Sequence, residues 1–385
     1  MTCGPFTEFD RAAMARAVAL AGKGLTTTHP NPRVGCVIAR GERIVGEGWH
    51  ERAGEPHAEI HALRAAGAEA SGATAYVTLE PCSHQGRTGP CAEALIAAHV
   101  ARVVFAVPDP DPRVNGRGAQ MLRNAGIEVA CGLLERQATE LNPGFLKRMR
   151  TGRPWVRVKL AMSLDGRTAL AGGASRWITG EAAREDVQHW RARSSALLTG
   201  IGTMLADDPR LDVRLPAAPA GPRPEPLRVV LDSRLKTPPD ARIFCTGGAV
   251  LILASQTAAG RDGDFDFRRA RLVQHAAVEV LAADGRGRPR LSDVLDLLGR
   301  QEVNELWVEA GARLAGAFLE HCLADELLLY VAPKVLGPQA RPLLELQEIR
   351  ELREAPGFAI VEVSRIGEDV RLRLRPSHEN GVPAG

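Results

Sequence analysis

The sequence of 385 residues lacks any uncharged apolar run of about 18 residues, the length needed for a helix that crosses a bilayer. Its N-terminus also lacks the basic start and apolar block of a secretory signal. We therefore expect no membrane partner.

Cysteines are few: there are seven, an odd number, at irregular spacing. This pattern argues against a disulfide framework and predicts free or metal-bound thiols in a reducing, cytoplasmic compartment.

Aromatic residues and excess charge are also scarce. Phe, Trp and Tyr make up 4% of the chain, and 49 basic residues nearly balance 46 acidic ones, for a formal net charge of +3. A groove for single-stranded nucleic acid needs aromatic side chains for base stacking and a concentrated basic surface. The composition supports neither, so we expect a small-molecule substrate and no nucleic-acid partner.

The length and composition predict two domains. Apolar residues make up 45% of the sequence, which is enough for two hydrophobic cores. The run N-P-G-F-L-K-R-M-R-T-G-R-P-W at 142–155 combines prolines, glycines and four basic residues with little apolar periodicity. We interpret it as an exposed linker and place the domains at 1–149 and 150–385.

The stretch from His57 to Cys91 carries a pattern typical of a catalytic metal site. It contains P-H-A-E-I-H at 56–61 and L-E-P-C-S-H-Q-G-R-T-G-P-C at 79–91. One imidazole and two thiolates, from His57, Cys82 and Cys91, suit Zn²⁺ and leave its fourth position open for water. Glu59 is then a nearby carboxylate that moves protons without binding the metal. This is the logic of the zinc nucleobase deaminases.

The same stretch permits two other interpretations. Eight residues separate the cysteines, whereas the general deaminase signature has two between them. A structural zinc site would need a fourth protein ligand, for which His61 or His84 is available. Alternatively, the histidines and cysteines are ordinary packed side chains without a metal.

Strands and helices alternate through the first half of the sequence. We expect strands at 34–39, 43–49, 73–79, 103–107 and 127–130, and helices at 8–22, 58–67, from about 92, and at 118–125. This order predicts an α/β three-layer domain that begins with a β-hairpin. His57 and Glu59 then lie at the start of a helix. Asn31, between two prolines, lies in a loop at the mouth of the sheet.

These motifs resemble the deaminase half of the bifunctional riboflavin-biosynthesis deaminase–reductase family. The resemblance rests on T-H-P-N-P-R-V-G-C-V-I, H-A-E, L-E-P-C-S-H-Q-G-R-T and P-D-P-D-P-R-V-N-G-R-G, and it includes the long cysteine spacing. It implies a cytidine-deaminase-like fold, zinc on His57, Cys82 and Cys91, and Glu59 as proton shuttle. The substrate contacts that it implies are Asn31, His84, Arg87 and Thr88. One departure is Gly89, where family members often have proline.

The second half also alternates strands and helices, with glycine turns after two strands. These turns, at 199–203 and 311–316, can present backbone N–H groups to phosphates and together suit a dinucleotide. No acidic residue marks a ribose contact, so the pattern does not favour NAD over NADP. We also expect a strand at 271–274 and an exposed Pro-rich loop at 216–226.

The second half resembles the reductase half of the same family, through K-L-A-M-S-L-D-G, S-R-W-I-T, R-A-R-S, G-T-M-L-A-D-D-P-R-L-D-V-R and V-E-A-G. The resemblance implies a dihydrofolate-reductase-like fold and NADPH. The implied cofactor contacts are Ala161, Trp177, Thr203, Asp207, Ser233, Gly311, Ala312, Arg313 and Leu314. The implied substrate contacts are Ser175, Arg191, Leu211, Arg214 and Glu309.

The sequence thus predicts a two-step enzyme of riboflavin biosynthesis. A zinc-dependent first domain would deaminate a pyrimidine ribosyl phosphate, and a second domain would reduce the ribosyl side chain with NADPH. Two alternatives remain: a reductase whose first domain holds zinc only structurally, and a nucleic-acid-binding zinc deaminase module. The sequence leaves a homo-oligomer open.

Overall fold

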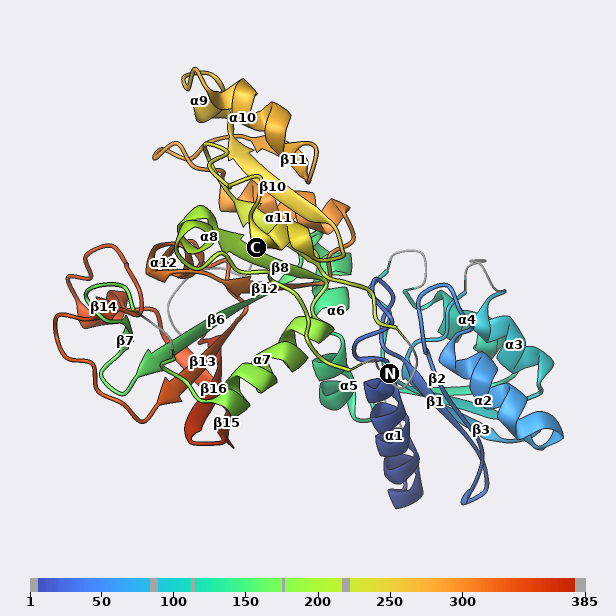
Figure 1. The fold of residues 1–385 in the computed structure, drawn as a ribbon. Helices are drawn as coiled ribbons and strands as arrows, with labels where there is room; N and C mark the ends of the chain where they lie inside the picture. The colour runs from blue at the N-terminus through green and yellow to red at the C-terminus, as the bar shows by residue number, and fades with distance from the viewer. Residues whose placement is uncertain (1–5, 84–88, 112–114, 175–176, 217–221, 378–385) are drawn as a thin grey trace. The chain divides into compact units, whose positions relative to one another are not determined.

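The computed structural model describes residues 6–83, 89–111, 115–174, 177–216 and 222–377 (Figure 1). The chain divides into two compact units. The first unit consists of Met1–Gly152 with Ala217–Pro224, and the second consists of Arg153–Pro216 with Glu225–Gly385.

The first unit is a sheet covered on both faces. Its strands are β1 (Gly35–Arg40), β2 (Arg43–Trp49), β3 (Thr74–Leu79), β4 (Arg102–Val107) and β5 (Glu128–Cys131). Its helices are α1 (Glu8–Ala21), α2 (Ala58–Ala66), α3 (Cys91–Ala97), α4 (Arg117–Asn124), α5 (Glu135–Leu141) and α6 (Pro143–Thr151). Short 3₁₀ turns occupy Gly22–Gly24 and Gly67–Ala70.

The five strands have the order β2-β1-β3-β4-β5. The pair β1–β2 is antiparallel, which confirms the predicted hairpin, and β3, β4 and β5 run parallel. Apolar residues of α2, α3 and α4 form one core with the sheet, and those of α1, α5 and α6 form another. The predicted three-layer arrangement is therefore confirmed.

The second unit is built on a larger sheet. Its strands are β6 (Trp155–Ser163), β7 (Arg167–Ala169), β8 (Ala196–Gly200), β9 (Leu227–Leu231), β10 (Val250–Ser255), β11 (Ala277–Leu281), β12 (Glu305–Glu309), β13 (Glu326–Ala332), β14 (Arg341–Pro342), β15 (Phe358–Ile366) and β16 (Asp369–Pro376). Its helices are α7 (Glu181–Arg193), α8 (Ile201–Asp207), α9 (Gln256–Ala259), α10 (Phe265–Leu272), α11 (Leu291–Arg300) and α12 (Ala312–Glu320), with 3₁₀ turns at Arg242–Cys245 and Leu352–Glu354.

Nine of these strands form one sheet in the order β11-β10-β9-β8-β12-β6-β13-β16-β15. Seven are parallel, from β11 to β13, while β16 and β15 continue the sheet in antiparallel pairing. A parallel sheet needs cover on both faces because its strands are apolar on both sides. Helices α11 and α12 cover one face and α7 to α10 contribute to the core on the other.

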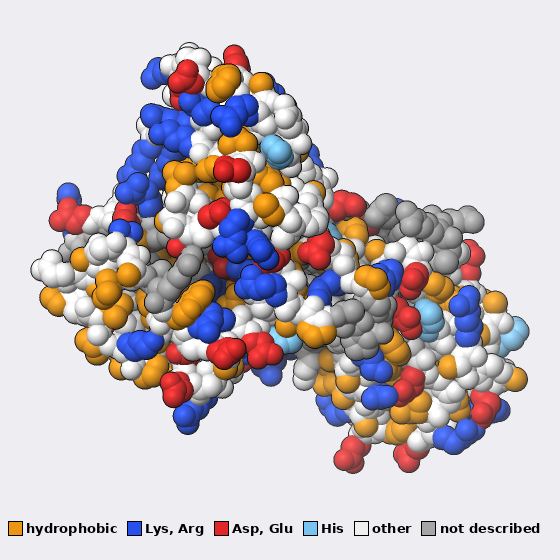
Figure 2. Space-filling model, in the orientation of Figure 1, with side chains coloured by type: hydrophobic (Ala, Val, Ile, Leu, Met, Phe, Trp, Pro, Cys, Tyr) orange, Lys and Arg blue, Asp and Glu red, His pale blue; other side chains and the backbone are white. Residues whose placement is uncertain are grey.

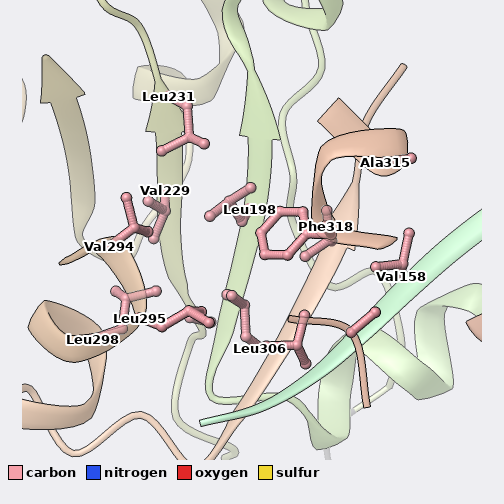
Figure 3. Close-up of a cluster of buried hydrophobic side chains, with 14 of the residues drawn as sticks. Val158, Leu198, Val229, Leu231, Val294, Leu295, Leu298, Leu306, Ala315 and Phe318 are labelled. Atoms are coloured by element: carbon pink, nitrogen blue, oxygen red, sulfur yellow. The ribbon is translucent and has the colours of Figure 1, made fainter. Parts of the chain in front are cut away.

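Figure 3 shows the core under α11 and α12. Side chains of β8, β9 and β12 point at Val294, Leu295 and Leu298 of α11, and Phe318 of α12 lies over Leu198. All of these side chains are buried. This packing fixes α12 against the sheet, so the start of α12 is held where β12 ends.

Two predicted segments differ in the structure. Residues 271–274, predicted as a strand, contain the end of α10. Leu272 is the last residue of that helix, and its side chain is buried. The predicted linker at 142–155 contains α6, whose Pro143 lies in the first turn, where its missing N–H costs nothing. Buried Leu146 joins the core of the first unit. Tertiary contacts therefore stabilise a helix that local composition does not indicate.

On the face that Figure 2 shows, acidic and basic side chains are interspersed and hydrophobic side chains are scattered between them. Among the described residues, every helix is too short or too polar to span a bilayer.

Candidate active sites

Three elements of the first unit bring the predicted metal ligands together. His57 is the N-cap residue of α2, Cys82 follows β3, and Cys91 is the first residue of α3. Helix α2 lies unusually close to β2 because Gly46 and Gly48 have no side chains. A Cβ at Gly48 would lie 2.5 Å from the Ala58 carbonyl oxygen. The glycines of β2 thus set the position of the helix start that carries His57.

The three ligand atoms lie within 4.8 Å of one another. His57 Nδ1 is 3.3 Å from Cys91 Sγ and 3.6 Å from Cys82 Sγ. The backbone N–H of Cys91 donates to Cys82 Sγ over 3.3 Å. Among the residues that the structure describes, no fourth His, Cys, Asp or Glu joins this cluster, and His61 lies outside it. This donor set fits zinc with one open position.

The two thiols ionise very differently. A hydrogen bond from Cys91 lowers the pKa of the Cys82 thiol, whereas that same hydrogen bond, together with burial, raises the pKa of Cys91. The pair therefore shares one proton. A divalent cation bound here would displace that proton, because metal ligation requires deprotonated thiols.

Glu59 lies in the first turn of α2 and is 3% exposed. Burial raises the pKa of its carboxyl group, and the nearby His57 opposes part of that shift. The carboxyl also hydrogen-bonds Cys91. A carboxyl with a raised pKa, beside the ligand cluster but outside it, can accept and return a proton, as a general acid and base must.

His50 is a residue of this site that the sequence analysis missed. Its Nδ1 is 3.2 Å from the Pro56 carbonyl oxygen, which only accepts, so Nδ1 carries the proton. Burial lowers the pKa of His50 to about 4, so the ring is neutral and Nε2 accepts. Asn31 Nδ2 therefore donates to Nε2 over 3.1 Å. This hydrogen bond turns the Asn31 carbonyl oxygen away from His50, ready to accept from a ligand.

We expect His50→Leu to raise the KM of the first unit's reaction about tenfold, the worth of one hydrogen bond, with zinc content unchanged. The amide of Asn31 would lose the partner that fixes its orientation. Steady-state kinetics and metal analysis measure both quantities. His99→Asn, at an exposed position of the same unit, is the control. An unchanged KM would show that His50 does not orient Asn31.

Four predicted substrate contacts, namely His84, Arg87, Thr88 and Ser175, lie outside the described residues.

The second unit contains a large cavity of about 1210 Å³ at the carboxyl ends of its parallel strands. Ligands bind in this region of α/β sheets. Eight of the nine predicted cofactor residues line the cavity: Ala161, Thr203, Asp207, Ser233, Gly311, Ala312, Arg313 and Leu314. Gly311 is the N-cap of α12, and the backbone N–H groups in the first turn of a helix suit a phosphate.

The ninth cofactor residue, Trp177, is not among the residues that line the cavity. Its ring is 63% exposed, and the Arg184 guanidinium lies over it, 4.6 Å from the ring centroid. Of the predicted substrate residues that the structure describes in the second unit, only Glu309 lines the cavity. Leu211 is buried in the core, where its side chain packs between helices and sheet.

Arg191 and Glu309 form a nearly buried ion pair at the wall of the cavity. Arg191 Nε and one terminal nitrogen donate to the two carboxylate oxygens over 2.6 and 2.8 Å. Arg191 also donates to the Asp212 carbonyl oxygen, next to the Arg214 segment. Burial would raise the pKa of Glu309, but the charge of Arg191 and its hydrogen bonds lower it to about 2. Glu309 is therefore an anion at all working pH values.

Lys159 is a second residue that the sequence analysis missed. It lies on β6 and lines the cavity, where burial lowers the pKa of its ammonium group and the charge of Glu309 opposes that shift. The sequence could have indicated it, because Lys159 lies in V-R-V-K-L-A, a run in which apolar residues alternate. A cation at an alternate position of a strand buried on both faces needs a partner or a ligand.

Two family models match the chain. The model described as the RibD C-terminal domain matches residues 154–372. The model described as the cytidine and deoxycytidylate deaminase zinc-binding region matches residues 7–107. The reductase model thus matches most of the second unit, and the deaminase model matches part of the first.

Curated relatives match over nearly the whole length. The chain is 49% identical over 373 residues to the riboflavin biosynthesis protein RibD of Escherichia coli (strain K12), covering 95% of this chain and 99% of the relative. It is 47% identical to the protein of that name from Haemophilus influenzae, covering 96% of this chain and 98% of the relative.

Solved structures agree. Acinetobacter baumannii RibD superposes with a TM-score of 0.88 at 45% identity, covering 96% of this chain and 99% of that one. A Thermotoga maritima protein, named as a diaminohydroxyphosphoribosylaminopyrimidine deaminase/5-amino-6-(5-phosphoribosylamino)uracil reductase, has a TM-score of 0.83 at 31% identity, with coverage of 96% and 99%. These matches confirm the predicted fold class. The chain belongs to the RibD family of bifunctional riboflavin-biosynthesis enzymes, with a zinc-binding deaminase domain followed by a reductase domain.

Proposed function

We propose that the first unit deaminates 2,5-diamino-6-(5-phosphoribosylamino)pyrimidin-4(3H)-one. We further propose that the second unit reduces the ribosyl side chain with NADPH, giving 5-amino-6-(5-phosphoribitylamino)uracil. The two activities for which the Thermotoga maritima protein is named support this choice of substrates. The observation that carries the deaminase half is the convergence of His57, Cys82 and Cys91 beside the buried carboxyl of Glu59.

We assign His57 Nδ1 and the sulfurs of Cys82 and Cys91 as the zinc ligands. Bound zinc supplies a Lewis acid that lowers the pKa of a water molecule at its open position, making that water a nucleophile at neutral pH. Water adds to the ring carbon that bears the 2-amino group, and ammonia leaves. Two cysteines and one histidine bring two negative charges, so the site favours a divalent cation even when buried.

Glu59 moves the protons of this hydrolysis. Its carboxylate takes a proton from the attacking water, and its carboxylic acid returns one to the departing nitrogen. The raised pKa of Glu59 suits both roles, because burial makes its carboxyl a stronger proton acceptor than an exposed carboxylate. Asn31, oriented by His50, accepts a hydrogen bond from the pyrimidine ring and holds the reacting carbon toward the ligand cluster.

In the second unit, NADPH supplies the hydride, and the protein binds and orients both reactants. We assign Thr203, Asp207, Ser233 and the start of α12 to the dinucleotide, since they line one continuous cavity. We place the ribosyl group beside Glu309 and Lys159, which line the same cavity, with Arg191 holding the carboxylate of Glu309. Lys159 is the cation near the reacting carbon, and its lowered pKa lets it give a proton to the developing hydroxyl.

Removal of zinc separates the two reactions. We expect a chelator such as dipicolinate to abolish ammonia release and added zinc to restore it. Reduction of separately supplied deaminated substrate should persist in the metal-free protein. Mass spectrometry identifies the products with and without NADPH, and NADH serves as the cofactor comparison. Deamination that persists without metal would contradict a catalytic zinc and favour a structural one.

A further inference from the structure

Glu80 is a buried acidic residue in the first unit that has no part in the proposed chemistry. It lies between the end of β3 and Cys82, and it is 3% exposed. No Arg, Lys or His forms an ion pair with it among the described residues. A buried carboxylate is costly unless its oxygens are hydrogen-bonded, so its partners must be other groups.

Those partners are three backbone N–H groups from the segment that leads into α4. Glu80 Oε2 accepts from Asp109 over 3.3 Å and from Gly116 over 3.0 Å. Oε1 accepts from Ala119 over 3.1 Å. Gly116 is the N-cap position of α4, so the carboxylate of Glu80 satisfies the start of a helix 36 residues further along the chain. The positive end of that helix also favours the charge.

The backbone after Glu80 touches the same helix. A Cβ at Gly118 would lie 1.9 Å from the Pro81 carbonyl oxygen, so only glycine permits this contact. On its other side, Cys82 is held to α3. Its carbonyl oxygen accepts from Ala92 over 3.2 Å, and its sulfur accepts from Cys91 over 3.3 Å. The segment that carries Cys82 is thus fixed between α4 and α3.

We propose that Glu80 is a positioning residue for the metal ligand Cys82. Its carboxylate joins α4 to the Glu80–Pro81–Cys82 segment, and Gly118 lets that segment seat against the helix. The sulfur of Cys82 is then held at the distance from His57 and Cys91 that one cation requires. This inference rests on the proposed zinc site and assigns part of the metal affinity to a residue that is not a ligand.

The test is Glu80→Gln, an isosteric change. A glutamine amide has one oxygen, so its NH₂ group would face a backbone N–H and at least one of the three hydrogen bonds would be lost. We expect zinc affinity to fall at least about tenfold, as for partners that orient metal ligands elsewhere. Competition with a chromophoric chelator measures the affinity. Visible absorption of the cobalt-substituted protein reports the ligand geometry, and we expect its bands to shift.

Three comparisons make the result decisive. Glu93→Gln, which removes an exposed carboxylate two residues after Cys91, should leave affinity unchanged. Gly118→Ala should lower zinc affinity like Glu80→Gln, because its Cβ displaces Pro81; it provides an independent test if Glu80→Gln folds poorly. Reductase turnover of the same chain reports that the second unit is intact.

A purely structural role predicts another result. Thermal unfolding of the metal-free protein would then shift, while zinc affinity and the cobalt spectrum of the folded variants stayed at the values of the unaltered protein. That outcome would overturn the inference. If the unaltered protein itself bound no zinc, the proposed function would fail instead, which keeps the two failures distinct.

Discussion

Glu59→Gln is expected to abolish ammonia release while the protein keeps its zinc and its reductase activity. Glutamine has the shape of glutamate but cannot accept the proton of the attacking water. Loss of a general acid and base typically lowers a rate by about 10² to 10⁴-fold, and here one residue serves both proton transfers. Zinc remains because Glu59 is not among the three clustered ligands. Ammonia release, metal content and NADPH oxidation are the three measurements.

Glu55→Gln is the matched control for this result, since Glu55 is exposed, close in sequence and outside the ligand cluster. Its deaminase rate should equal that of the unaltered chain. If Glu59→Gln retained full deaminase activity, another group would have to move the protons, and the assignment of Glu59 would be wrong.

Glu309→Gln is expected to lower kcat/KM of the reductase about 100-fold and to destabilise the second unit. The substitution leaves the guanidinium of Arg191, whose side chain is 9% exposed, without its carboxylate. Removing one partner of a buried ion pair costs about 3–5 kcal/mol. Released from that pair, Arg191 no longer holds the Asp212 segment, and Lys159 loses the nearest negative charge. A shift of about 1 Å in the residues that position a substrate can lower the rate about 100-fold.

The control for the second unit is Glu185→Gln, because Glu185 is an exposed residue of α7 and is not among the residues that line the cavity. Thermal unfolding, with NADPH oxidation on supplied deaminated substrate, measures both effects. Deaminase activity should not change in either variant. Equal reductase activity in Glu309→Gln and Glu185→Gln would refute the role given to the Arg191–Glu309 pair.

The structure brings together the three side chains that the sequence singled out, because the chemistry of zinc ligands restricts the choice of residues; their role as ligands stays a prediction. The first and last of these residues, His57 and Cys91, are 34 positions apart in the sequence. Each of the three follows a strand or lies at the start of a helix, and the spacing of apolar residues predicts those strands and helices. His50 and Lys159 were missed for the opposite reason. His50 is a single polar residue directly after β2, and Lys159 is a single polar residue within β6. Only the packed sheet shows that His50 contacts Asn31 and that Lys159 lines a cavity.

Local composition failed where distant residues decide the structure. The run at 142–155 has the glycines and prolines of a linker, yet Leu146 finds a core surface to pack against and the segment is helical. The segment 271–274 is too short for the spacing of its apolar residues to distinguish a strand from the end of a helix. Arg191 was predicted as a substrate contact. The structure shows its guanidinium held by Glu309, which no spacing between the two could indicate.

The two glycines of β2 have a consequence for how this enzyme tolerates change. Gly46 and Gly48 carry no functional atom, and each would bring a Cβ within 2.3 to 2.5 Å of a carbonyl oxygen of α2. A methyl group at either place would push out the helix whose first turn bears both an imidazole and an acid. Mutational screens should therefore find positions remote from any reacting atom that are as intolerant as the ligands, and the cause would be steric exclusion rather than lost chemistry.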